Sequence, residues 1–503
     1  MDSHIVPACL ESLFTSNLPP VDSEAAHLRH LLAAAATGLN QVDSRIGALH
    51  EELARLLMQR DDLVARMEQY KAVLSPVRRI PPEVLCEILE WLPPGFQRVD
   101  YYQVAQPPWR LAHICSLWRE TAIGCPSLWT GLGIIHADDY FFPTTAMLEA
   151  QLDRTASAPL HIDFELSSQS LGAASAWDSL LPLSHRWKSL RIRCVEPDAA
   201  MELLDNLQAA KDRVTLLEKV DFFINEANAS VDHSCDCFST APRLRELHLT
   251  NSTFTQYSPA FAAPWAQITS YRGVFPPARQ LDILRACLGI VDCTVGYDEE
   301  STDPPLAANV TLPLVRRLHV EHVSILANIT SPALHTLLIP SAASHTQLLV
   351  TFLQRSSCRL NTLVITKCDD ANDVVPVLAS CPGLEQFVLS SYTFNLGGMS
   401  ALLDSLCLPA TPPYLTICPN LASFALGWKI KGEPVWCDVL LRMLQSRLVQ
   451  IPQRLRSVCL FTTDFNTVLE KVEGIRRLEN EQGLDFKYLT LQQGKQFMAE
   501  LRP

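Results

Sequence analysis

The sequence lacks a net positive charge, a long apolar run and a basic amino-terminal leader, and each absence argues against a class of protein. The 503 residues carry a formal net charge of −13, which disfavours binding to bare nucleic acid or to an anionic membrane because both require a basic surface. No run of about 18 apolar residues suggests a membrane-spanning helix. Asp2 and Glu11 lie near the start, with no basic segment ahead of an apolar run, so a secretory signal is not expected. We expect a cytoplasmic or nuclear protein with protein partners.

The motifs of common enzyme classes are also missing. His50 and Glu51 begin like a zinc-protease motif, but Ala54 stands where the second histidine belongs. Gly131 begins like a dinucleotide-binding loop, but His136 occupies the position of the last glycine. The sequence contains no P-loop and no G-x-S-x-G segment. We therefore expect a protein that is not an enzyme, with no catalytic residue and no cofactor.

Cysteine is abundant but scattered. The chain has 16 cysteines, and in a long intracellular chain we expect them to be free thiols that pack as small hydrophobes. The densest group is His233, Cys235 and Cys237, which are three potential metal ligands. A second ligand pair at zinc spacing is missing, so we expect a polar loop and no metal there. A rival interpretation is an enzyme with an undetected Cys/His site, which would require one reactive thiol of depressed pKa.

Residues 24–74 form a proline-free segment with apolar residues at alternating spacings of three and four. Arg60 is the one break in this heptad pattern, which predicts a long helix of coiled-coil type. The apolar seam consists of Leu39, Val42, Ile46, Leu49, Leu53, Leu56, Leu63, Met67, Tyr70 and Leu74. The helix either dimerises as a coiled coil or packs along the rest of its own chain. Leu57 and Val64 widen the apolar stripe, which weakens the case for a parallel homodimer.

Two short helices are predicted after this segment. Pro82 and Glu83 suit the first turn of a helix, whose apolar residues are Val84, Leu85, Ile88, Leu89 and Leu92, and which ends at Pro93 and Pro94. A second helix is predicted to place Leu111, Ile114, Cys115 and Trp118 on one face. From periodicity alone, a helical hairpin inside a larger core is the favoured interpretation of these two helices.

The order of these residues is more specific than their periodicity. A proline and an acidic residue followed by Val-Leu, Ile-Leu and then Ile-Cys-x-x-Trp-Arg resembles the F-box, a motif that docks on a Skp-type adaptor. The following GCPSLWTGL resembles an extension found in many fungal F-box proteins, in which a tryptophan leads into the first strand of a repeat domain. The resemblance covers residues 74–132, and the loop 93–109 is longer than in compact F-boxes.

The resemblance implies which residues form the apolar core and surface that meet the adaptor. They are Ile80, Pro81, Val84, Leu85, Ile88, Leu89, Leu111, Cys115 and Trp118. Affinity would come from a few central apolar side chains, so Leu85→Asp is expected to abolish adaptor binding.

A short pattern, apolar-x-x-apolar-x-apolar, recurs beyond Leu132. Its copies begin at Trp187, Leu217, Leu244, Val315, Leu334, Leu360, Leu384, Leu421 and Leu455, with weaker copies at Ile268 and Leu288. The pattern is typical of the strand of a leucine-rich repeat, and helix-like runs such as ARQLDILRACL and TQLLVTFLQR separate the copies. We expect units of strand, turn and helix that stack into an α/β solenoid with parallel strands on its concave face.

Contacts with a partner would come from exposed positions between the apolar ones. Examples are Arg245, Glu246, His248, Arg316, Arg317 and His319. The expected organisation is a disordered segment 1–23, a heptad helix 24–74, an F-box 75–132, a leucine-rich-repeat solenoid 133–490 and a C-terminal tail 491–503.

The resemblance implies a non-catalytic substrate receptor of a Skp–cullin-type ubiquitin ligase. Its F-box would recruit the adaptor and, through it, cullin and RING subunits, while the repeats would bind a protein substrate that the sequence does not identify. The alternative is a leucine-rich-repeat scaffold that uses the F-box without ubiquitin transfer.

Overall fold

A computed structural model describes most of the chain. The described residues are 13–14, 17, 19–91, 108–137, 140–142, 145–166, 172–194, 204–224, 234–251, 260–297, 309–342, 345–368, 370–391, 396–408, 417–428, 437–448, 455–462 and 469–501. The chain divides into two compact units, Met1–Leu85 and Cys86–Pro503. The predicted disordered segment 1–23 and the predicted loop 93–109 lie largely outside the described residues.

The first unit is dominated by one long helix. Helix α2 runs without interruption over Asp22–Leu74 because the segment contains no proline and its first turn carries acidic residues that suit the positive end of a helix. Surface ion pairs such as Glu52–Arg55 (2.6 Å) and Glu68–Lys71 (2.7 Å) follow one another along it. No residue of α2 is buried, so the predicted apolar seam is exposed along its length. The predicted long helix is confirmed.

A short turn links α2 to the next helix. It is the 3-10 helix η1 (Pro76–Arg79), and helix α3 (Pro82–Glu90) follows it, crossing from the first unit into the second. Within the described residues, no helix is both long and apolar enough to cross a membrane.

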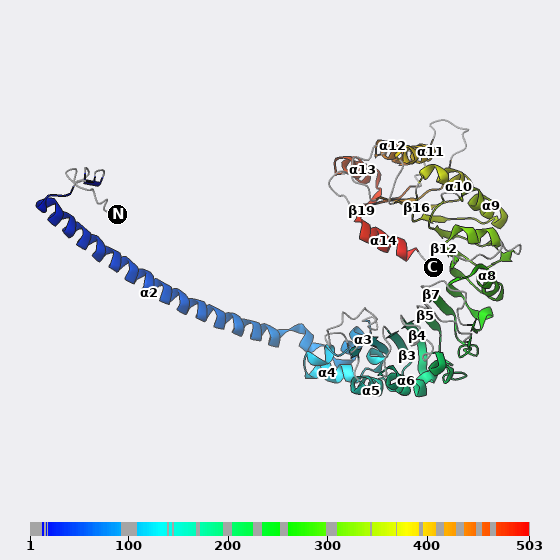
Figure 1. The fold of residues 1–503 in the computed structure, drawn as a ribbon, viewed down its shortest axis with the longest axis horizontal. Helices are drawn as coiled ribbons and strands as arrows, with labels where there is room; N and C mark the ends of the chain where they lie inside the picture. The colour runs from blue at the N-terminus through cyan, green and yellow to red at the C-terminus, as the bar shows by residue number, and fades with distance from the viewer. Residues whose placement is uncertain are drawn as a thin grey trace. The chain divides into compact units, whose positions relative to one another are not determined.

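Most of the second unit is one large sheet (Figure 1). Among the described residues, 15 strands join this sheet in chain order, except that β2 lies at the edge beyond β1, and every pairing is parallel except that of β1 with β2. The strands are β1 (Gly131–Ala137), β2 (Tyr140–Phe142), β3 (Leu160–Leu166), β4 (Trp187–Cys194), β5 (Lys219–Ile224), β7 (Glu246–Asn251), β9 (Ser270–Phe275), β10 (Asp292–Tyr297), β12 (Arg317–Val320), β14 (Thr336–Ile339), β15 (Thr362–Ile365), β16 (Gln386–Ser391), β17 (Ser423–Trp428), β18 (Ser457–Thr462) and β19 (Asp485–Thr490). Each predicted repeat copy contains or leads into one of these strands.

Apart from α4, which precedes β1, helices connect successive strands and lie along the outer side of the curved sheet (Figure 1). They are α4 (Ser116–Ile123), α5 (Thr145–Arg154), α6 (Gly172–Leu180), α8 (Pro277–Ala286), α9 (Thr346–Ser356), α10 (Val375–Ala379), α11 (Leu396–Ser405), α12 (Cys437–Leu448) and α13 (Leu469–Gln482). The 3-10 helices of this unit are η2 (Leu111–His113), η3 (Pro126–Trp129), η4 (Leu181–Arg186), η5 (Trp265–Gln267), η6 (Val323–Asn328) and η7 (Ala371–Val374). Two short sheets pair β6 (Ser234–Cys235) with β8 (Ala260–Phe261) and β11 (Val310–Thr311) with β13 (Ile329–Thr330).

The core lies between the sheet and these outer helices. In β3, Leu160, Ile162, Phe164 and Leu166 are buried while the residues between them are partly exposed, since side chains alternate between the two faces of a strand. The buried positions of the other strands continue this core from Leu132 to Leu484. The predicted α/β arrangement with a large parallel sheet is confirmed.

Two arginines, Arg447 (buried) and Arg355 (partly buried), bind loop carbonyl groups between successive strand-and-helix repeats. The Arg447 guanidinium donates to the carbonyl oxygens of Leu406, Ile417 and Cys418 at 2.8–2.9 Å. Arg355 donates in the same way to the carbonyls of Leu326 and Ile329. Burial lowers the pKa of Arg447 to about 10, and the dipoles of the three backbone carbonyls stabilise its charge. The guanidinium in return supplies hydrogen-bond donors to these buried carbonyl groups.

The C-terminal segment 491–503, assigned to a tail by the sequence, contains a packed helix. Helix α14 (Leu491–Glu500) begins directly after β19, with the Thr490 hydroxyl accepting from the Gln493 amide and the Gln493 side chain accepting from the Thr490 amide. This reciprocal pair satisfies two donors at the start of the helix. In Figure 1, α14 lies on the inner side of the sheet, opposite the other helices.

Candidate partner-binding surfaces

Helix α3 carries two apolar stripes. Leu85 and Leu89 are one turn apart and only 1% exposed, so they belong to the core. Val84 and Ile88 lie on an adjacent face of α3, Trp91 follows in the turn directly after the helix, and the three side chains are 45%, 47% and 88% exposed. Sequence periodicity placed these apolar residues on one face. The structure instead separates a buried stripe from an exposed one, and the exposed stripe is the candidate docking surface.

The second predicted helix of this region is interrupted. Leu111 lies in η2, and Cys115 has an extended backbone (φ −161°, ψ 176°), so α4 begins only at Ser116. The Arg119 side chain donates to the Ala112 carbonyl at 2.9 Å and holds the two pieces together. The prediction of one continuous helix from Leu111 to Trp118 is therefore wrong, because the extended backbone of Cys115 interrupts it.

The remaining residues named by the F-box resemblance differ in exposure. Pro81 and Cys115 are exposed, whereas Ile80, Leu111 and Trp118 are partly buried. Trp91 was not among the named residues, although its position seven residues after Val84 could have identified it.

A tryptophan joins these helices to the sheet. Trp129, at the end of η3, is fully buried, and its indole N–H donates to the Ala122 carbonyl of α4 at 2.7 Å. The Gln151 side chain donates to the Trp129 and Gly131 carbonyls at 3.0 and 2.9 Å, at the start of β1. The Arg154 guanidinium stacks 4.3 Å from the Trp129 ring. The helical segment is thus anchored to the first strand of the sheet.

The first half of the inner face of the sheet is polar. Asp163, Arg191, Asp221, His248 and Arg272 are paired in register across β3, β4, β5, β7 and β9. Arg191 bridges two carboxylates, at 3.1 Å from Asp163 Oδ2 and 3.2 Å from Asp221 Oδ2. We call this set the charged row, and its members are open to a partner that offers hydrogen-bonding groups.

A second row of charges runs beside it. Lys219 lies 2.7 Å from Glu246, and Arg317 donates to Asp292 at 2.6 Å. Glu246, His248, Arg317 and His319, which were predicted as exposed positions, therefore lie in the inner rows, although His319 is buried.

Partial burial changes the protonation of the charged row. Burial raises the pKa of the Asp163 carboxyl above its ordinary value despite the neighbouring Arg191 cation. Burial also lowers the pKa of His248 and of His161, so both imidazoles are neutral near pH 7. The charged row therefore offers one neutral histidine, His248, between its charges, and His161 lies two residues before Asp163 on the same strand.

The second half of the inner face is apolar and covered. The corresponding positions of β14 to β18 are Leu338, Val364, Val388, Ala425 and Cys459. They form a buried cluster of their own with Phe461 of β18 and Met498 of α14. Helix α14 contacts β17, β18 and β19. This part of the face is therefore occupied by the chain's own C-terminal helix.

Two glycines shape that contact. The Phe461 ring lies directly over Gly427 of β17, where any Cβ would overlap the ring. A Cβ on Gly494 of α14 would overlap the same ring from the other side. Phe461 is thus enclosed between a strand and a helix that approach closely because both positions lack a side chain.

The cysteine pair singled out by the sequence is buried. The Cys235 and Cys237 sulfur atoms lie 3.3 Å apart, and both side chains are fully buried. His233 lies outside the described residues. The segment that the sequence predicted as a polar loop is therefore buried at these two cysteines.

Comparison of the sequence with protein-family models and with curated proteins finds no match. The assignment of function below accordingly depends on the residues and their placement in this chain.

Proposed function

We propose that this protein is the substrate receptor of a Skp–cullin-type ubiquitin ligase. Residues 75–132 act as an F-box that docks on a Skp-type adaptor, and the following sheet acts as a leucine-rich-repeat domain that holds a protein substrate. The observation that carries the proposal is the exposed stripe of Val84 and Ile88 on α3 and Trp91 directly after it, lying beside the buried pair Leu85 and Leu89.

The exposed stripe has the chemistry of a protein-binding site. Large apolar side chains in one contiguous exposed group favour association, because burial removes apolar surface from water at about 25 cal/mol per Å². Tryptophan is among the residues that most often dominate the energy of an interface, and Trp91 is 88% exposed. Trp91 and Ile88 are therefore the expected centre of the adaptor contact.

The sheet supports the second half of the proposal. Stacked strand-and-helix units give an extended inner face suited to binding a protein, and the charged row leaves polar groups on that face. The receptor's contribution to ubiquitin transfer would be to hold substrate lysines near the ubiquitin-loaded enzyme and so raise their effective concentration.

Four buried thiols are unsuited to nucleophilic catalysis, and Cys235, whose pKa is lowered by its hydrogen bond with Cys237, is fully buried. Burial raises the pKa of Cys287, Cys381 and Cys418 to about 12 and that of Cys459 to about 11. Such thiols are protonated at neutral pH and are poor nucleophiles.

The test is a matched pair of aspartate substitutions in the full chain. Ile88→Asp should weaken binding to a purified Skp-type adaptor by at least about 30-fold, since a central apolar contact is worth about 2 kcal/mol or more. Leu314→Asp is the control, because Leu314 has a similar exposure of 52% but lies just before β12 of the sheet and not on α3. Binding is measured by calorimetry, and folding by circular dichroism.

Ile88 is a sharper target than Leu85. Leu85→Asp would place a carboxylate in the core and lose binding through misfolding, so it cannot separate docking from stability. Adaptor binding by a folded Ile88→Asp protein at the affinity of the unaltered chain would refute the docking surface. Recovery of the adaptor without cullin would instead support a scaffold that acts without ubiquitin transfer.

A further inference from the structure

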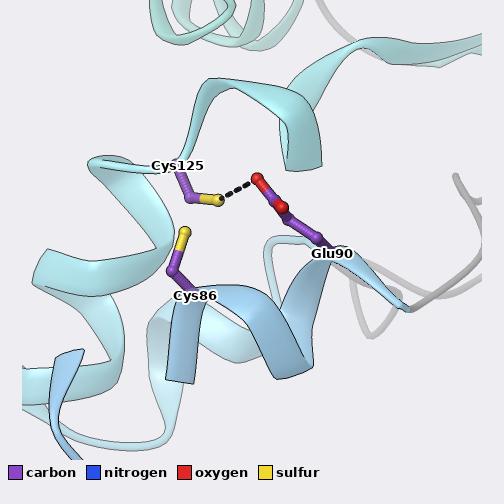
Figure 2. A group of neighbouring side chains, drawn as sticks. All are labelled: Cys86, Glu90 and Cys125. Atoms are coloured by element: carbon purple, nitrogen blue, oxygen red, sulfur yellow. Dashed lines mark hydrogen bonds between the residues drawn. The ribbon is translucent and has the colours of Figure 1, made fainter. Parts of the chain in front are cut away.

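A second group of side chains gathers where α3 meets the segment after α4. Cys86 and Glu90 are one turn apart on α3, and Cys125 lies immediately before η3. The sulfur atoms and a carboxylate oxygen of these residues all lie within 4.8 Å of one another. Figure 2 shows the three side chains pointing toward one another from the two segments.

The spacing of these atoms suits a tetrahedral metal ion. Cys125 Sγ is 3.6 Å from Glu90 Oε1. Zinc binds thiolate sulfur at about 2.3 Å and carboxylate oxygen at about 2.0–2.2 Å, which places the two ligand atoms about 3.6 Å apart at a tetrahedral angle. The sulfur and the oxygen therefore already have the separation that a shared zinc ion requires.

Ser127 supports the arrangement from outside the triad. Its hydroxyl donates to Glu90 Oε1 at 2.8 Å and lies 3.4 Å from Cys125 Sγ. A hydrogen bond of this kind fixes the orientation of a carboxylate ligand, as outer partners do in known metal sites. Cys125 is buried, Cys86 is partly buried and Glu90 is exposed, so an ion could enter from the Glu90 side.

We propose that Cys86, Glu90 and Cys125 form a Zn²⁺-binding site, with water as the fourth ligand. Two thiolates disfavour Mg²⁺ and Ca²⁺, which prefer oxygen ligands, and a carboxylate disfavours Cu⁺, which prefers soft ligands. Zn²⁺ accepts both ligand types. Binding would release the two thiol protons to solvent and would join α3 to the η3 segment.

Among the described residues, only this triad brings three potential ligand atoms together. Cys235 and Cys237 supply a pair of close thiols with no such third ligand in that part of the chain. That pair is therefore a matched control for thiol chemistry that does not involve the proposed site.

The test uses the full-length, reduced, metal-free protein, titrated with Co²⁺ and then with Zn²⁺ against a chromophoric chelator. One equivalent of Co²⁺ should give a thiolate charge-transfer band and intense tetrahedral bands in the visible spectrum, and Zn²⁺ should displace it. Cys86→Ala and Cys125→Ala should abolish the bands. Glu90→Gln changes an exposed ligand and should weaken Zn²⁺ binding at least about 10-fold with the fold retained.

The control is the double variant Cys235→Ala/Cys237→Ala, which should keep the Co²⁺ spectrum. Loss of the bands in this control with retention in Cys86→Ala would overturn the assignment. So would the absence of stoichiometric binding to the unaltered protein, or unaltered Zn²⁺ affinity in folded Glu90→Gln. A Cys86–Cys125 disulfide in protein purified without oxygen would likewise overturn it, because both thiolates are needed for the ion.

Discussion

The two halves of the sheet's inner face share one backbone and differ in chemistry. At the central position of each strand, the first half carries Asp163, Arg191, Asp221, His248 and Arg272, and the second carries Leu338, Val364, Val388, Ala425 and Cys459. The polar half is open, whereas the apolar half is buried together with Met498 of α14. The residue at this position is thus polar where the face is partly exposed and apolar where the face is buried with the chain's own helix, while Thr294 and His319 between the two halves are polar and buried.

The sharpest test of this difference compares two phenylalanines. Phe461 lies two residues beyond Cys459 on β18 and is fully buried, while Phe223 lies two residues beyond Asp221 on β5 and is partly exposed. Phe461→Ala should lower the free energy of unfolding by about 3–5 kcal/mol, because it leaves a cavity under α14. Phe223→Ala should cost about 1 kcal/mol.

Urea unfolding followed by circular dichroism measures both values. Equal losses in the two variants would mean that α14 does not enclose Phe461, and the contrast between the halves would then fail.

A smaller effect is expected at the glycine that lets α14 approach the sheet. Gly494→Ala would normally stabilise a helix by about 1 kcal/mol, but its Cβ would overlap the Phe461 ring. Overpacking costs about 1–3 kcal/mol, so the net effect should be a loss of stability of about 1 kcal/mol.

Gly474→Ala in α13 is the matched control. Its Cβ would meet Leu441 at an ordinary 3.4 Å, so this variant should gain about 0.5–1 kcal/mol from helix propensity. Thermal unfolding of the two single variants gives the signs, and stabilisation by Gly494→Ala would contradict close packing of α14.

Much of the sheet could be predicted from the sequence because its pattern is local. In segments such as LHTLLI and LEQFVL, each apolar residue marks a buried position of one strand, and the structure places strands there. Strand β19 was missed because its residues are mostly only partly buried, so it lacks the strong pattern. The docking of α14 was missed because it depends on Gly427 and Gly494, which lie far apart in the chain.

The candidate sites show the same limit. The apolar residues of α3 could be identified from the sequence. Periodicity alone does not say which of two adjacent apolar stripes is buried. The structure places Leu85 in the core and Ile88 on the surface. Cys86 and Glu90 have the one-turn spacing of ligands on a helix, but Cys125 joins them only through tertiary packing. A sequence pattern confined to one element could not have found that third ligand.

A similarly small effect is expected in the polar half, and it depends on pH. Arg191→Ala removes the cation that lies between Asp163 and Asp221, and should cost about 1 kcal/mol at neutral pH, the upper end for partly exposed ion pairs. Burial already raises the folded-state pKa of Asp163, and loss of Arg191 raises it further.

In the variant, the folded-state pKa of Asp163 then lies further above its unfolded-state pKa. At a pH between these two values folding takes up a proton. The variant therefore becomes more stable as the pH falls through the folded-state pKa. The difference from the unaltered protein should therefore be largest near pH 7 and should shrink in mild acid. Lys188→Ala is the control, since Lys188 is partly exposed and lies 3.9 Å from Glu218. A deficit in Arg191→Ala that stays constant with pH would show that Asp163 does not depend on Arg191, and the charged row would then be a set of independent surface charges.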